Sequence, residues 1–217
     1  MHVPLVAVVA AFVLGLPSPV DITGADDPFV GSVTRLNRAT RELMTGSSWR
    51  PGCPVPLRAL RLVRVTYRGF DGEPHRGRLV VLRRWAGEVL GVFEAIYEAD
   101  FPIRRVRLVD RYGADDRESM RRDNTSAFNC RYIAGTTTWS QHAYGRAIDL
   151  NPVENPYVDG SRVSPRKGRR YLDRDDVRPG MVTAGNVAWT AFDDLGWGWG
   201  GDWSSVKDYQ HFSANGR

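Results

Sequence analysis

The spacing between a histidine and an aspartate in the second half of the chain restricts the fold more than any other feature. His142 and Asp149 are seven residues apart, which would place them about 23 Å apart, on opposite faces of an uninterrupted strand. Two ligands of one zinc ion must instead lie about 3–4 Å from each other. If these side chains share a metal, the chain must reverse between them. Gly145 is well placed for this reversal, because glycine adopts backbone angles that other residues avoid.

A second histidine near the carboxyl end could complete the ligand set. The chain has only four histidines, and each of them alone is more simply a structural residue than a ligand. Together, His142, Asp149 and His211 would leave the fourth position of a tetrahedral zinc ion open, as in catalytic rather than structural sites. Asp208, just before His211, could then accept a proton from water as a general base.

The residues around these candidates resemble a family of zinc peptidases. Residues 140–149, with the sequence SQHAYGRAID, are similar to the Ser-x-His-x-x-Gly-x-Ala-x-Asp motif of the LAS peptidases (lysostaphin, D-Ala-D-Ala carboxypeptidase and hedgehog type). Residues 208–212, DYQHF, resemble the closing acid-x-x-His element of that family. The resemblance is closest to the D-Ala-D-Ala carboxypeptidase and L-Ala-D-Glu peptidase branch, and it extends from about Cys53 to Phe212.

This resemblance implies a fold, a cofactor and an activity. The fold would be α+β, with a small antiparallel sheet flanked by helices. One Zn²⁺ per chain would be held by His142, Asp149 and His211, with Asp208 as the base where many relatives have glutamate. The reaction would be hydrolysis of amide bonds in peptidoglycan stem peptides, of either the carboxypeptidase or the endopeptidase type. The alternative is a non-catalytic zinc-containing cell-wall binding module of the same fold.

Three further residues are candidates for substrate contact. The resemblance implies that Arg131 stabilises the oxyanion of the tetrahedral intermediate, with a structural arginine as the alternative. Ser140 could also touch the substrate, although a turn residue bonded to the local backbone is an equal interpretation. Residues 196–203, GWGWGGDW, could form a cleft wall with Trp199 in contact with the substrate. Core packing of these tryptophans is the alternative.

The beginning of the chain predicts export. Residues 3–16 carry no charge, and this length suits the hydrophobic region of a signal peptide better than a bilayer span of about 20 residues. A buried amino-terminal helix is the alternative. A cleavage site could lie at residues 23–25. We therefore expect a secreted or cell-envelope-associated monomer that contacts the membrane only through an uncleaved amino-terminal segment.

Cysteine content and charge give two further expectations. Cys53 and Cys130 could form one disulfide in an oxidising compartment, or remain two buried thiols. The net charge of +5 and the pI near 9.5 would attract a polyanion, whether nucleic acid, anionic lipid or an acidic polymer of the envelope. The basic residues are scattered and no nucleic-acid motif is present, so we expect no nucleic-acid partner.

Periodicity predicts the order of the secondary-structure elements. Alternation of helices and strands without βαβ regularity favours α+β, and the chain divides into the segment 1–25, an amino-terminal helix and linker over 26–52, and a zinc peptidase domain over 53–217. Helices are expected at 29–45, 84–99 and 187–195. Strands are expected at 60–67, 78–82, 103–109, 144–150 and 209–212, with a long ordered loop at 110–140 and a polar excursion at 153–180.

Overall fold

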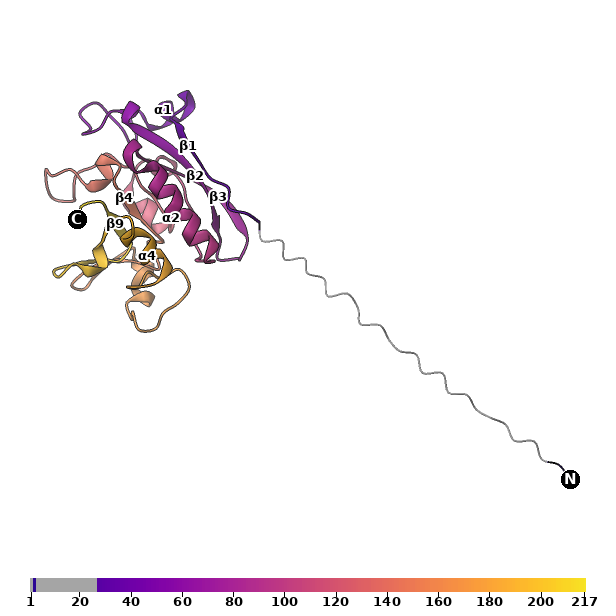
Figure 1. The fold of residues 1–217 in the computed structure, drawn as a ribbon. Helices are drawn as coiled ribbons and strands as arrows, with labels where there is room; N and C mark the ends of the chain where they lie inside the picture. Colours follow the sequence, from indigo (N-terminus) through magenta and orange to yellow (C-terminus); the bar gives the residue numbers. More distant parts are fainter. Residues whose placement is uncertain (1, 3–26) are drawn as a thin grey trace.

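The computed structural model describes His2 and residues 27–217. The predicted signal segment, residues 1–25, lies outside the described residues except for His2. The described chain forms three small antiparallel sheets and four α-helices, connected by 3₁₀ turns and long loops (Figure 1). The predicted α+β class is therefore confirmed. Within the described residues, no helix is both long enough and apolar enough to cross a membrane.

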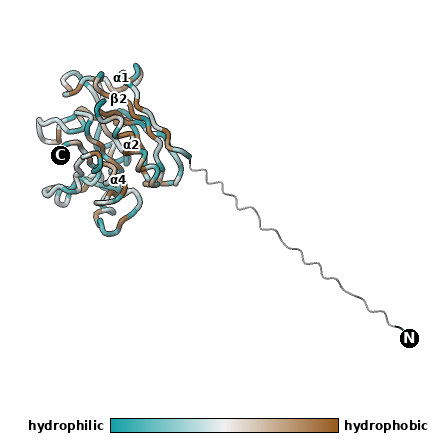
Figure 2. The backbone as a smooth tube through the Cα atoms, viewed as in Figure 1, coloured by the Kyte–Doolittle hydropathy of each residue, from teal (hydrophilic) through white to brown (hydrophobic). Residues whose placement is uncertain are grey.

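The first sheet contains β1 (Ser32–Arg35), β2 (Leu60–Arg68) and β3 (Pro74–Leu82), in the order β1-β2-β3. Side chains alternate between its two faces. Val63, Val65 and Tyr67 of β2 contribute to the larger core cluster, whereas Leu60 and Leu62 contribute to a second one. Hydrophobic and hydrophilic stretches are interspersed along the backbone of the folded part of the chain (Figure 2). The sheet therefore separates two hydrophobic cores.

Helix α2 (Ala86–Glu98) covers the face that contributes to the larger core (Figure 1). Its buried side chains recur at helical spacing; they are Ala86, Val89, Val92, Phe93, Ile96 and Tyr97. Helix α1 (Arg38–Met44) lies at the other core, where Met44 packs with Leu60, Leu62 and the disulfide that joins Cys53 to Cys130. Both faces of the first sheet are thus covered.

The predicted helix over residues 29–45 is wrong in its first half. Residues Ser32–Arg35 instead form β1, which pairs with β2 from Ser32↔Arg64 to Arg35↔Arg61. The helix begins only at Arg38, because Asn37 adopts an extended backbone and its side chain accepts a hydrogen bond of 2.8 Å from the Thr40 amide. Pairing with the distant strand β2 provides the backbone hydrogen bonds that these residues would otherwise form within a helix.

The other two sheets come from the second half of the chain. One contains β4 (Ala147–Asp149), β9 (His211–Ser213) and β7 (Gly198–Trp199), in that order. The other has the order β6 (Arg162–Ser164), β5 (Tyr157–Asp159) and β8 (Lys207–Asp208). Helix α4 (Val187–Asp193) packs onto the first of these through stacked rings of Phe192 and Phe212, whose centroids are 4.1 Å apart.

Several predicted boundaries differ from the structure. Residues 103–109 form no strand, only a bridge between Val106 and Thr125. The predicted loop over 110–140 contains α3 (Asp116–Arg121), which Asp115 caps at its amino end. The strand expected from residue 144 begins at Ala147, because residues up to Tyr144 form a 3₁₀ turn. These segments form their backbone hydrogen bonds in short turns, a short helix or a single bridge. Apolar periodicity does not reveal such bonds.

Candidate metal centre

The candidate metal centre lies on the sheet that contains β4 and β9. Asp149 of β4 is directly opposite His211 of β9, so the two side chains project from the same face. Their neighbours Ile148 and Phe212 are also directly opposite each other, project from the other face and are fully buried in the larger core. The apolar pair therefore anchors the strands while the polar pair faces the centre.

His142 reaches the same face because the chain reverses before β4. It lies in the 3₁₀ turn Gln141–Tyr144, which ends at Gly145 with φ of +66°. A Cβ atom at position 145 would come within 2.7 Å of the Leu82 backbone nitrogen, whose N–H donates to the Gly145 carbonyl. Only glycine fits both the left-handed conformation and this close approach. The reversal that the sequence predicted at Gly145 is therefore present.

The three predicted ligand side chains converge on one point. The distance from His142 Nε2 to Asp149 Oδ2 is 3.1 Å, and the distance from His211 Nδ1 to Asp149 Oδ1 is 3.0 Å. The two histidine nitrogens are 3.3 Å apart. All three residues are buried, and in the described chain they form the one group of at least three His, Cys, Asp or Glu with metal-binding geometry. These separations match those of ligands around a zinc ion.

The positions of the imidazole protons test whether a metal fits. His142 donates from Nδ1 to the Ala127 carbonyl at 2.5 Å, and His211 donates from Nε2 to the backbone oxygen of Arg217, the last residue of the sequence, at 3.2 Å. With these tautomers, assigned from the hydrogen bonds, His142 Nε2 and His211 Nδ1 carry lone pairs toward the Asp149 carboxylate. Three electron-rich atoms this close need a cation or extra protons between them, and outer hydrogen bonds of this kind are typical of zinc-ligating histidines.

The electrostatics of the centre also favour added positive charge. Burial acts to raise the pKa of Asp149, but its contacts with the imidazoles of His142 and His211 outweigh burial and hold that pKa well below its usual range. Burial acts to lower the pKa of His211, but the hydrogen bond and charge of Asp149 raise it above its usual value. The carboxylate thus remains ionised and attracts a cation.

Asp208 lies in β8, beside this centre. The strand pairs with β5 at Tyr157, and the half-buried Asp208 carboxylate accepts a hydrogen bond of 3.0 Å from the Gln210 side chain. Burial and the negative charge of Asp149 raise the pKa of Asp208 to about 6. A Cβ atom at Gly200 would lie 2.9 Å from the Asp208 Cβ, so this glycine allows the close approach of the preceding turn.

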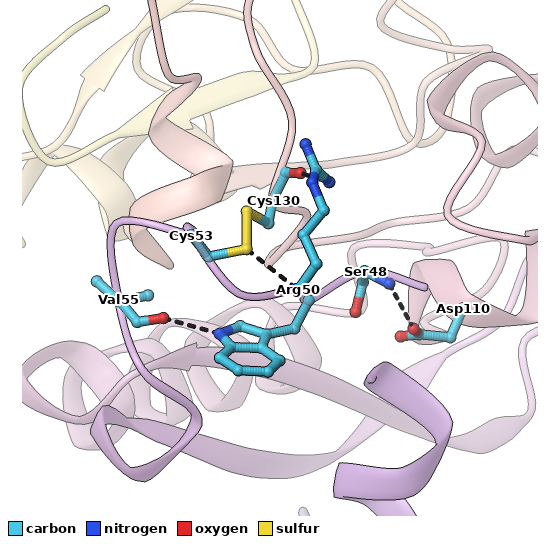
Figure 3. The surroundings of a disulfide bond; sticks show 7 residues. Ser48, Arg50, Cys53, Val55, Asp110 and Cys130 are labelled. Atoms are coloured by element: carbon cyan, nitrogen blue, oxygen red, sulfur yellow. Dashed lines mark hydrogen bonds between the residues drawn. A yellow bond between two sulfur atoms is a disulfide. The ribbon is translucent and has the colours of Figure 1, made fainter. Parts of the chain in front are cut away.

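Arg131 forms an ion pair with Asp116 of α3, with 2.9 Å between Nη2 and Oδ2. Its Nε is buried and has no hydrogen-bond partner in the structure. The preceding residue, Cys130, is held by several contacts from the amino-terminal part of the chain (Figure 3). Its carbonyl accepts from Arg50 and its amide donates to Ser48. The backbone that carries Arg131 is therefore fixed, while the predicted oxyanion role stays a prediction.

The two predicted substrate contacts lie in unlike environments. Ser140 caps the 3₁₀ turn, because its hydroxyl accepts a hydrogen bond of 3.4 Å from the His142 amide. A hydrogen bond to the local backbone is the alternative that the sequence left open for Ser140. Trp199 is only 7% exposed in the larger core, and its indole N–H donates to the Tyr209 carbonyl, which is the core packing given as the alternative for this tryptophan. Apolar packing against Phe212 draws it inward.

Sequence reasoning missed several residues at the centre. Trp203, in the same glycine-rich segment, is half-buried, and its ring centroid is 5.6 Å from that of His211. Repeated Trp-Gly pairs gave no signal that distinguishes it from Trp199. The backbone oxygens of Ala127 and Arg217, which orient the histidines, have no side-chain signature at all.

A match to a known family covers the part of the chain that contains the three candidate ligands and the candidate base. A family model described as D-alanyl-D-alanine carboxypeptidase matches residues 134–214. No curated protein and no solved structure matches the chain significantly. The matched segment includes His142, Asp149, Asp208 and His211, whereas Arg131 and both cysteines lie outside it. The predicted resemblance is confirmed over this segment, and it supports a peptidase.

Proposed function

We propose that this protein is a zinc-dependent peptidase that hydrolyses amide bonds in the stem peptides of peptidoglycan. The observation that carries the proposal is the convergence of His142 Nε2, the Asp149 carboxylate and His211 Nδ1 in one buried group. The second ring nitrogen of each histidine donates to a backbone oxygen. The match to a carboxypeptidase family supports the reaction class and the type of substrate.

The three side chains would hold one zinc ion. When bound, zinc supplies Lewis-acid chemistry, because it lowers the pKa of water to about 7 and polarises a carbonyl. Asp208 accepts the proton of the attacking water and passes it to the leaving amine. Its partner Gln210 orients the carboxylate through the hydrogen bond to Oδ1. Asp208 must be ionised to accept this proton, so turnover should fall when acid protonates this carboxylate, whose pKa burial and the charge of Asp149 raise above its usual value.

Arg131 stabilises the negative charge that develops on the carbonyl oxygen. A guanidinium has five N–H donors and remains charged at all relevant pH. Asp116 takes a hydrogen bond from Nη2 and orients the side chain, which leaves other donors available for the oxyanion. The fixed backbone at Cys130 keeps this charge in place.

Incubation of the zinc-loaded protein with purified muropeptides, followed by mass spectrometry, tests the proposal. We expect loss of stem-peptide residues in a chelator-sensitive manner, and the product mass distinguishes removal of a terminal D-Ala from internal cleavage. His211→Ala should abolish both zinc binding and cleavage. His75→Ala is the matched control, because this histidine pairs with Asp71 away from the centre. Stoichiometric zinc without any cleavage would favour the non-catalytic binding module.

We also propose that the protein is exported, which the uncharged segment 3–16 supports. A reporter fused after Ala25 should leave the cytoplasm. A variant with Val9→Arg and Leu14→Arg should retain the same reporter inside, because charges interrupt the hydrophobic region. Cytoplasmic retention of the unaltered fusion would contradict export and leave the peptidase proposal untouched.

A further inference from the structure

A pocket lined by arginines lies on the side of the first sheet that faces α1. It has a volume of about 310 Å³ and is lined by Arg76, Arg78, Arg107 and Arg111, together with Leu43, Val106 and Leu108. We call it the arginine pocket. Val106 and Leu108 are buried and Leu43 is 43% exposed. Cationic groups thus surround a pocket in which Leu43 is the exposed apolar side chain.

The backbone that carries three of these arginines is rigidly held. Arg76 and Arg78 flank Gly77 in β3, where a Cβ atom would lie only 2.4 Å from the Val106 Cβ. Glycine therefore lets β3 approach the segment that carries Arg107, and the Arg78 amide donates to the Val106 carbonyl at 3.1 Å.

Asn124 fixes that segment from the other side. Its fully buried side chain accepts from the Arg107 amide and donates to the Arg107 carbonyl, both at 3.0 Å. The amide of the next residue, Thr125, donates to the Arg105 carbonyl at 3.0 Å. The arginines of the pocket are therefore presented by a fixed framework and not by a loose loop.

The positive charge of the pocket has no counterpart in the described part of the chain. None of its four arginines forms an ion pair within 4.0 Å of an acidic side chain, and no acidic residue lines the pocket. Arg78 is also directly opposite Arg64 on the neighbouring strand, and like charges in such pairs destabilise a sheet. A bound anion would relieve this repulsion.

We propose that the arginine pocket binds a phosphodiester group of a linear polyanion with an aliphatic backbone. Guanidinium groups match the geometry of phosphate oxygens through paired hydrogen bonds, and the exposed Leu43 side chain offers an apolar contact to the aliphatic linker. Single-stranded nucleic acid is disfavoured because the lining contains no aromatic side chain on which a base could stack. A bilayer is disfavoured because the site is concave and exposes only Leu43 for insertion.

Binding of a fluorescent glycerol phosphate oligomer to the full-length protein, followed by anisotropy, tests this proposal. Arg76→Gln, Arg78→Gln and Arg107→Gln, combined, should weaken binding by about tenfold or more and reduce its salt dependence. The matched control combines Arg58→Gln, Arg83→Gln and Arg166→Gln, which removes the same charge from exposed positions outside the pocket. This control should weaken binding by no more than about twofold.

Three results would overturn the proposal. Wild-type protein could fail to bind the oligomer, or the two triple variants could lose affinity equally, which would show a response to net charge alone. Anionic lipid vesicles or single-stranded DNA could bind more tightly than the oligomer with the same dependence on the pocket. Cleavage of muropeptides by the pocket variant should equal that of the wild type, so failure of this proposal is distinguishable from failure of the proposed peptidase.

Discussion

Four side chains at the candidate centre have two different roles, although they lie close together. His142, Asp149 and His211 present converging lone pairs, whereas Asp208 belongs to a different sheet and accepts a hydrogen bond from Gln210. Loss of a ligand should therefore remove zinc and activity together. Loss of the base should remove activity alone.

Asp208→Asn is expected to retain zinc while turnover falls by about 10²–10⁴-fold, because the amide cannot accept a proton at neutral pH. Metal analysis and steady-state cleavage of a muropeptide measure the two effects separately. His142→Ala should instead lose zinc affinity and turnover together. Near-wild-type turnover in Asp208→Asn would assign the base elsewhere, with Asp116 and Asp202 as the next residues to substitute.

Among the elements, the segment before β2 connects the amino-terminal part of the chain to the loop that carries Arg131. The disulfide between Cys53 and Cys130 spans 77 positions of sequence, and the Trp49 indole and the Ser48 amide add hydrogen bonds around it (Figure 3). The disulfide restricts the conformations of the unfolded chain. In the folded chain it holds Cys130, the residue before Arg131.

Replacement of both Cys53 and Cys130 by alanine should lower the free energy of unfolding by about 4 kcal/mol, because a closed loop of this length restricts the unfolded ensemble. Urea unfolding of the variant and of the oxidised wild type gives the difference. The wild type in reductant should approach the variant. Equal stability of the oxidised protein and the variant would show that the bridge contributes nothing.

At the scale of the whole molecule, one buried carboxyl group links stability to pH. Glu154 is fully buried and accepts a hydrogen bond from the Tyr171 hydroxyl. Burial and then the adjacent Asp123 raise its pKa from 4.5 to about 8. The folded protein therefore holds a proton at neutral pH that the unfolded chain releases.

Protonated Glu154 contributes its full share to the free energy of unfolding below about pH 4.5. This contribution is lost as the pH rises through about 8. Glu154→Gln keeps the shape and cannot ionise, so its free energy of unfolding should depend less on pH across this interval than that of the wild type. Urea titrations of both proteins at matched pH and zinc measure the difference. Parallel pH profiles would contradict the protonated state.

Sequence alone determined the local chemistry of the candidate centre. The ligand residue types, the left-handed turn at Gly145 and the amphipathic stripe of α2 depend on neighbours within a few positions, and spacing encodes such neighbours directly. The family resemblance added the pairing of the two distant motifs. For the same reason, the α+β class and most elements were predictable. The strand β1 was not, because a helix was predicted over these residues.

Only the tertiary structure decided the features that depend on distant partners. Pairing with β2 turned residues 32–35 into a strand, and core packing buried Trp199 while Trp203 came to lie beside His211. The backbone oxygens that orient the two histidines leave no mark in the pattern of side chains. The scattered arginines became a pocket only because Gly77 lets β3 approach Val106. Such contacts join residues far apart in the chain, so no local pattern contains them.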